Sequence, residues 1–308
     1  MDWLDAHLIP ALDGVAYGML LFVVAAGLTL AFGSGGVLNL AHGTVYAMGA
    51  YIAADIGDGS WGMLVLALAV GAAAGATSGG VLAVAVAPVA RRGHLDQALL
   101  TFGIALVGGD MLVSYFGADQ RQVAVPKALE DSVTIAGHQY PTYRLAFIGV
   151  AALLAGLGYW LLVRSTAGAA VRATTDDPEM VAALGLSPRV VHTATLVVAG
   201  ALAGGAGVLG APIITPSPET ADTVMLWSLI IVVVGRLGSV LGALFAAIAV
   251  GEVQTLGVVL APDLAPYLLF GAMGIALLVR SGSGILPEFA ARARVLATRA
   301  RALKGGGA

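Results

Sequence analysis

The sequence contains no cysteine, and charged and aromatic side chains are scarce. Without cysteine, disulfide bridges, thiolate metal sites and cysteine nucleophiles are excluded. Only 11% of the 308 residues are charged and 59% are hydrophobic, whereas about a quarter of the residues in a typical soluble domain are charged. Aromatic residues make up 6%, and the mean hydropathy is +0.93. These shortages predict an integral membrane protein.

Recognisable catalytic motifs are missing as well. The sequence has no GxxxxGK[ST] phosphate loop, no HExxH zinc helix and no GxSxG nucleophile elbow. Its five histidines, His7, His42, His94, His138 and His192, are scattered and do not suggest a metal site. We therefore expect a chain that is not an enzyme and binds no cofactor or metal. Any ATP hydrolysis that drives it must occur in another chain.

Long apolar stretches recur along the chain. A helix needs about 20 largely apolar residues to cross a membrane, and about nine stretches approach this length. We expect an all-α polytopic membrane protein with about 8–10 transmembrane helices. The short stretch Val224–Gly235 is predicted to be a broken or re-entrant element, which is tolerated where protein covers it, and it leaves the helix count around 222–240 open. The candidate stretches are Leu12–Phe32, Val37–Asp55, Gly62–Val89, Leu95–Phe116, Tyr143–Val163, Val191–Gly210, Val224–Gly235, Val240–Leu260 and Leu264–Val279.

Basic residues gather beside alternate stretches, and such residues favour the cytoplasmic side of a membrane. We therefore expect the N-terminus outside, the C-terminus in the cytoplasm, and a transmembrane domain at 1–280. The external loop at 117–142 carries a turn signal at Gly137, which suggests a small hairpin. This loop is either a solvated connector or a docking surface for an extracytoplasmic partner. The basic cytoplasmic tail at 281–308 is expected to lie on anionic lipid rather than to bind nucleic acid.

One polar segment, TTDDPEMVAALGLSPRV, separates two apolar stretches and has the signals of a short helix. Asp176 or Asp177 can accept hydrogen bonds from the free amides of its first turn. Pro178 suits the first position, and Glu179 complements the positive end of the helix dipole. Gly185 is the expected left-handed stop.

This coupling segment, at about 176–186, is expected to be cytoplasmic. Met180, Val181 and Leu184 are predicted to form one apolar face. A helix this short is marginal in water, so it needs a surface to pack against. It lies either on the bilayer or its own subunit, or in a groove of a separate cytoplasmic protein.

Three segments resemble permease subunits of ATP-binding-cassette importers, specifically the branched-chain amino acid group. The first, PEMVAALGLSPRVVHTATLVVAGALAGGAGVLGAP, resembles the coupling segment of these permeases. The second, GVAYGMLLFVVAAGLTLAFGSGGVLNLAHGTVYAMGAYIA, resembles their first two helices with an Asn-x-Ala-His-Gly signature. The third, VVVGRLGSVLGALFAAIAVGEVQ, resembles a glycine-rich late segment that usually has glycine where Arg236 stands.

The resemblance implies a permease subunit that moves branched-chain or other hydrophobic amino acids by alternating access. An extracytoplasmic binding protein would deliver the solute, and ATP with Mg would be bound by two cytoplasmic ATP-binding subunits. It also implies a second permease subunit, homologous or identical, and a multi-pass location in the bacterial cytoplasmic (inner) membrane. Related permeases also carry urea, amides or aromatic acids. The implied contacts with the ATPase are Asp177, Pro178, Glu179, Met180, Ala182, Ala183, Leu184 and Gly185.

Polar residues inside the apolar stretches are candidates for the translocation path, because they are costly in lipid. Asn39 and His42 lie in LNLAHG, where the backbone could unwind, and they either hold this break together or touch the solute. Tyr46 follows on the same helix face and either packs or lines the path. Glu252 either bonds another helix or contacts the solute.

Asp110 poses the same choice, and we favour a structural bond. Arg236 near the cytoplasmic end either snorkels or pairs with an acidic neighbour. The small-residue sets GAAAGATSGG and AGALAGGAG are interpreted as faces where helices touch.

The alternative function is an ion-gradient-driven secondary transporter of a small organic solute. It would use Glu252, Asp110 or His42 as protonatable groups beside broken helices. The capped cytoplasmic helix and the absence of paired carboxylates within the stretches argue against it. A membrane-embedded enzyme lacks any recognisable site.

Overall fold

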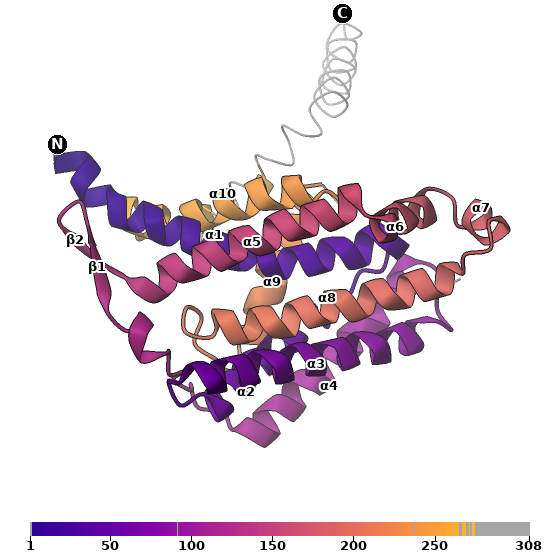
Figure 1. Cartoon of the computed structure of the whole chain (residues 1–308), viewed down its shortest axis with the longest axis horizontal. Coiled ribbons are helices and arrows are strands. Elements are labelled where there is room, and N and C mark those ends of the chain that lie inside the picture. The colour runs from indigo at the N-terminus through magenta and orange to yellow at the C-terminus, as the bar shows by residue number, and fades with distance from the viewer. Residues whose placement is uncertain are drawn as a thin grey trace, which may run out of the picture.

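The computed structural model describes residues 2–90, 92–236, 238–264, 267, 268, 271, 273 and 274, and of residues 2–6, 34 and 35 the backbone alone. This part of the chain is a bundle of helices with one small hairpin (Figure 1). The elements are α1 (Asp2–Gly35), α2 (His42–Ile56), α3 (Trp61–Val86), α4 (His94–Phe116), the 3-10 turn Lys127–Leu129, β1 (Ser132–Ile135), β2 (His138–Pro141), α5 (Thr142–Arg164), α6 (Thr166–Asp176), α7 (Pro178–Ala183), α8 (Pro188–Gly210), α9 (Thr220–Val234) and α10 (Val240–Leu260).

Six of these helices are long and apolar enough to cross a membrane: α1, α3, α4, α5, α8 and α10. With the shorter α2 and α9, of 15 residues each, they account for all predicted stretches except the last. The all-α polytopic fold class is therefore confirmed. The ninth stretch, Leu264–Val279, lies largely outside the described residues, and the predicted tail at 281–308 lies wholly outside them.

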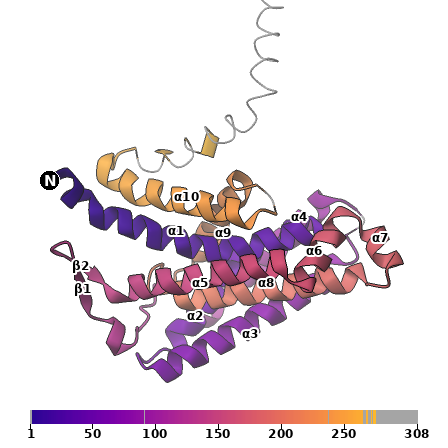
Figure 2. The ribbon, with the colours of Figure 1, turned by 45° about the horizontal axis from the view of Figure 1, so that its top comes forward.

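α1 and α8 form the centre of the bundle. α1 packs against α10, α8 and α5, and α8 packs against α3 and α2 (Figure 2). In the most apolar window of α1, 72% of the residues are buried, whereas the share in α4 is 6%. The outer helices α4 and α5 therefore present most of their surface to whatever surrounds this chain.

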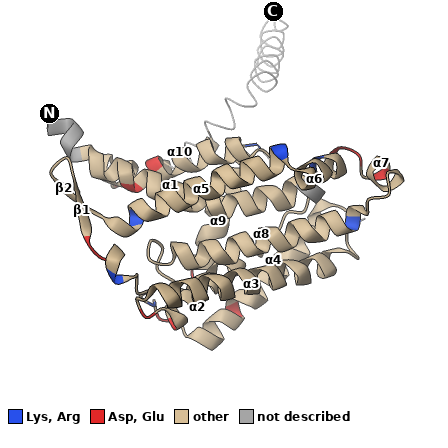
Figure 3. Ribbon diagram, viewed as in Figure 1, with Lys and Arg blue, Asp and Glu red and all other residues tan. Residues whose placement is uncertain are grey.

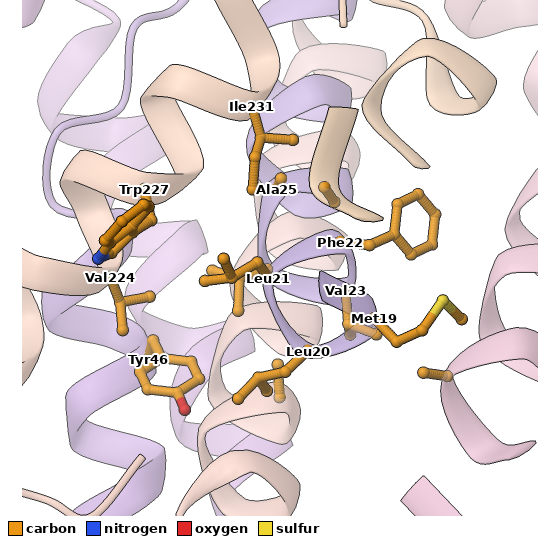
Figure 4. Close-up of a cluster of buried hydrophobic side chains, with 14 of the residues drawn as sticks. Met19, Leu20, Leu21, Phe22, Val23, Ala25, Tyr46, Val224, Trp227 and Ile231 are labelled. Atoms are coloured by element: carbon orange, nitrogen blue, oxygen red, sulfur yellow. The ribbon is translucent and has the colours of Figure 1, made fainter. Parts of the chain in front are cut away.

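Large side chains fill the space around the middle of α1. Leu21 and Phe22 of α1 lie in one buried cluster with Tyr46 of α2 and with Trp227 and Ile231 of α9 (Figure 4). Tyr17 meets Trp227 edge to face, with ring centroids 6.5 Å apart. The two short helices are thus anchored to α1.

Charged residues lie mainly toward the two ends of the bundle (Figure 3). One end carries the N-terminal end of α1 and the hairpin, and the other carries α6 and α7. β1 and β2 pair antiparallel, with Ile135 opposite His138, and Gly137 has φ +87. The hairpin with its turn at Gly137 is therefore confirmed.

The hairpin end is tied to the bundle by an ion pair. Arg144 of α5 pairs with Asp13 of α1, and Tyr140 of β2 is buried beside them. Burial, together with the nearby Asp13 carboxylate, raises the pKa of the Tyr140 phenol. The phenol therefore stays neutral throughout the physiological pH range.

Candidate functional site

The short helix α7 is closed at both ends by local bonds. Oδ1 of Asp177 accepts the N–H groups of Glu179 and Met180 at 3.0 and 2.9 Å. Pro178 occupies the first turn. Gly185 has φ +86, and its N–H donates to the carbonyl of Ala182 at 3.0 Å. The predicted cap, with Asp177 as the capping residue, and the predicted stop are both confirmed.

The apolar side chains of α7 point in two directions. Val181 is buried, with 2% of its surface exposed, whereas Met180 and Leu184 are 59% and 75% exposed. The prediction that the three residues share one face is therefore wrong. The helix is one turn and a half long, and packing through Val181 holds it on its own chain. Met180 and Leu184 remain available to another protein.

An additional amphipathic helix, α6, leads directly into α7. The Ser165 hydroxyl accepts the N–H of Gly168 at 3.0 Å and so begins the helix. The Thr175 hydroxyl, one residue before the end of α6, donates to the carbonyl of Gly33 in α1. The coupling segment is thereby attached to the last turn of α1. The sequence interpretation missed α6, although Ser165 followed by polar and small residues is a start signal that could have revealed it.

Between α1 and α2 the backbone leaves the helical conformation, as LNLAHG predicted. Gly36 has φ +63. The buried Thr101 hydroxyl of α4 accepts the N–H of Leu40 at 3.1 Å and lies 2.9 Å from the carbonyl oxygen of Leu38, to which it can donate. Oδ1 of Asn39 accepts the N–H of Ala41 at 3.1 Å. Buried backbone without helical bonds needs such partners in a membrane, and side chains supply them here.

The candidate path residues of α2 and its approach are buried in this chain. Asn39, His42 and Tyr46 have at most 3% of their surface exposed. Nε2 of His42 lies 2.9 Å from the carbonyl oxygen of Val24, to which it can donate. These contacts agree with the first of the two alternatives above, in which Asn39 and His42 stabilise the unwound backbone. Contact with a solute stays a prediction.

The other ionisable candidates lie apart from this break. Oε2 of Glu252 is buried near Gly14 of α1 and has no hydrogen-bond partner among the described residues. Asp110 on α4 is exposed and forms no hydrogen bond or ion pair within the described part of the chain. No helix of the described residues covers the face of Asp110, so the structural bond to another helix that we favoured stays a prediction.

The sequence as a whole matches a known transporter family. The family model described as "Branched-chain amino acid transport system / permease component" matches residues 11–278. The chain belongs to this permease family. The permease is therefore a transport protein rather than an enzyme, and a multi-pass protein of the bacterial cytoplasmic membrane.

Individual relatives are moderately similar. The permease is 27% identical over 296 residues to the high-affinity branched-chain amino acid transport system permease protein BraD of Pseudomonas aeruginosa, covering 91% of this chain and 95% of BraD. It is 29% identical over 262 residues to LivH of Escherichia coli K12, covering 79% and 83%. It is 28% identical over 296 residues to LivM of the same strain, covering 87% and 68%. No solved structure matches.

A groove of about 410 Å³ runs along α1, α5, α6 and α8 of the permease. Its lining includes Phe22, Leu157, Val171, Val191 and Val198 and is almost wholly apolar. A zwitterionic amino acid carries two charges that need polar partners when removed from water. The groove offers almost none, so it is unsuited to carry such a solute.

Proposed function

We propose that the permease is the membrane subunit of an ATP-driven importer of branched-chain or other hydrophobic amino acids. Two cytoplasmic ATP-binding subunits, which hold ATP and Mg, drive its alternating access. An extracytoplasmic binding protein delivers the solute at the hairpin end. A second permease subunit, of the kind represented by LivH and LivM, completes the membrane part.

The observation that carries this proposal is the pair of exposed apolar side chains on α7. Met180 and Leu184 project from a helix that Asp177 and Gly185 hold in a fixed conformation. Large apolar side chains on a rigid short helix suit insertion into a groove of another protein. Basic residues surround α6 and α7, as is typical of the cytoplasmic side of a membrane. They are Arg164, Arg172 and Arg189.

The contacts behind α7 supply a route for motion. Displacement of α7 pulls on α6, which is bonded through Thr175 to Gly33. Gly33 lies three residues before Gly36, where the unwound stretch begins. A movement of the ATPase would therefore be transmitted to the unwound stretch between α1 and α2. Such a shift changes the state of the permease only if ATP binds the two states unequally.

Replacement of Leu184 by aspartate tests the proposal. A carboxylate would enter the apolar groove of the ATPase without a partner, so we expect co-purified ATPase and ATP-driven uptake by proteoliposomes to fall at least about tenfold. The thermal unfolding of the permease should not change, since Leu184 is exposed.

Val133→Asp is the matched control, because Val133 is also an exposed apolar residue but lies in the hairpin at the opposite end. It should leave ATPase recovery unchanged. Normal ATPase recovery and uptake with Leu184→Asp would contradict the docking role of α7.

A further inference from the structure

The outward face of α4 carries a carboxylate where lipid would otherwise surround it. Asp110 precedes the last residue of α4, Phe116, by six positions, which is about 9 Å along a helix. Its side chain is exposed and makes no bond within the described residues. Placing an aspartate inside a bilayer costs about 3 kcal/mol at the centre of a helix. The short side chain of Asp110 also cannot reach the interface as lysine or arginine would.

α5 shows what a lipid-facing helix of this protein looks like. It is almost as exposed as α4, and Val150, Leu153, Leu157 and Trp160 project from it. Between Arg144 and Arg164 it has no charged residue. The two outer helices therefore differ in kind, and only α4 places a charge on its open face.

Small residues lie on α4 near the same carboxylate. An added Cβ at Gly103 or Gly109 would meet no atom within 4 Å, so none of the described residues occupies the space above them. Glycine on a membrane helix allows a second helix to approach closely. The exposed Leu106 and Val107 between them supply apolar surface for packing.

A second exposed carboxylate stands on α9. Asp222 is exposed and follows Ala221, which lies against Gly43 in the first turn of α2. Thr44, which follows Gly43 in α2, donates to the carbonyl of Ala105 in α4 at 3.3 Å. Two helices that contact the first turn of α2 therefore each carry, on the outer surface of the bundle, a carboxylate without a partner among the described residues.

We propose that the outward face of α4, together with the first turn of α9, is the interface with a second permease subunit. That subunit supplies a hydrogen-bond donor to Asp110. The inference rests on the proposed function, from which the second permease is taken.

The charges indicate that the partner is a homologous chain rather than a second copy. In a twofold symmetric pair the same surface meets itself. Neither α4 nor α9 contains lysine or arginine, so a copy would set Asp110 and Asp222 against surfaces of the same sign. A permease of different sequence can provide the missing basic or amide donor. The similarity of this chain to both LivH and LivM of one strain shows that two such permeases coexist in one organism.

Photo-crosslinking in membranes that contain the complete transporter tests this interface. With p-benzoylphenylalanine in place of Leu106 on α4, we expect an adduct with a permease of different sequence, identified by mass spectrometry. With the same group in place of Leu153 on α5, which is 71% exposed, we expect no protein adduct. An adduct between two copies, no protein adduct at position 106, or equal adducts at both positions would overturn the proposal.

Two variants of Asp110 give an independent measurement. Asp110→Leu should lower the amount of co-purified second permease at least tenfold, while Asp110→Asn, which keeps an acceptor, should retain most of it. If Asp110→Leu left the amount of co-purified second permease unchanged, Asp110 would face lipid and the proposed interface would be wrong. Missing adducts with intact ATP-driven uptake would refute the interface alone. Adducts at position 106 with uptake that needs no ATP would refute the proposed function and leave the interface standing.

Discussion

Arg236 occupies a backbone conformation that favours glycine. Its φ is +72, in the turn between α9 and α10, and its side chain is exposed. The left-handed region costs a residue with a Cβ about 1 kcal/mol. Arg236 therefore carries a backbone strain that glycine would not.

We predict that Arg236→Gly raises the free energy of unfolding by about 0.5–1 kcal/mol, because glycine adopts φ +72 without a steric penalty. Thermal unfolding of the purified permease in detergent measures this change. Arg236→Ala is the control, since it removes the same charge but keeps the Cβ. Equal stabilisation by both variants would show that the charge, and not the backbone, was responsible.

Single residues were predictable where a local rule decides their role. Asp177 and Gly185 follow capping rules that depend on a few neighbouring positions, and the structure has them in those roles. The bonds from Thr101 to the unwound backbone were missed, because they join residues about 60 positions apart. The direction of Val181 likewise depends on packing that the local pattern does not contain.

At the scale of elements, glycine decides how closely α3 and α8 approach. Gly75 and Gly200 face each other, and a Cβ on either would overlap the carbonyl oxygen of the other. Gly79 lies in the same way against the backbone at Leu196. Because lipid does not drive membrane helices together, close backbone contact stabilises the pair. The interpretation of GAAAGATSGG and AGALAGGAG as contact faces is confirmed.

We predict that Gly75→Leu lowers the free energy of unfolding by about 2 kcal/mol or more, because the two backbones must separate to admit the side chain. Denaturation in detergent micelles, followed by circular dichroism, measures the loss. Gly156→Leu on α5 makes the same exchange where an added Cβ meets no atom within 4 Å, and it should be nearly neutral. Similar losses for both variants would contradict the contact.

The apolar helices among the described residues were predictable in approximate position, since apolar length largely fixes a membrane helix, whereas the polar α6 was not. The predicted Val240–Leu260 coincides with α10. The predicted Val37–Asp55 was too long at its start, because α2 begins at His42. Residues 37–41 are apolar enough for a helix, but bonds from Thr101 of α4 to the backbone of Leu38 and Leu40 accompany a non-helical conformation that ends in a turn. Hydropathy predicts that a residue lies in the membrane, but it does not predict the backbone conformation of that residue.

For the whole molecule, the distribution of basic residues predicts which end faces the cytoplasm. The basic residues around α6 and α7 predict that this end lies inside and that the hairpin end lies outside. The absence of cysteine makes the test simple, because a single introduced thiol is the only one in the chain.

We predict that Thr134→Cys in the hairpin reacts with a membrane-impermeant maleimide on intact spheroplasts. Glu179→Cys on α7 should react only after the membrane is permeabilised. Both residues are exposed in this chain, so accessibility alone does not distinguish them. Labelling of Glu179→Cys from outside would reverse the orientation and remove α7 from the ATPase.

We expect the stretch from Gly36 to Ala41, which is not helical, to be the most easily deformed link between α1 and α2. A continuous helix resists bending, because every turn is fastened by its own backbone bonds. Here side chains hold the backbone instead: the Thr101 hydroxyl, the Asn39 amide and the His94 ring, whose Nδ1 lies 2.8 Å from the carbonyl oxygen of Gly36. Each such bond contributes about 1 kcal/mol, so we expect the chain to bend here at a lower cost than within α1 or α2.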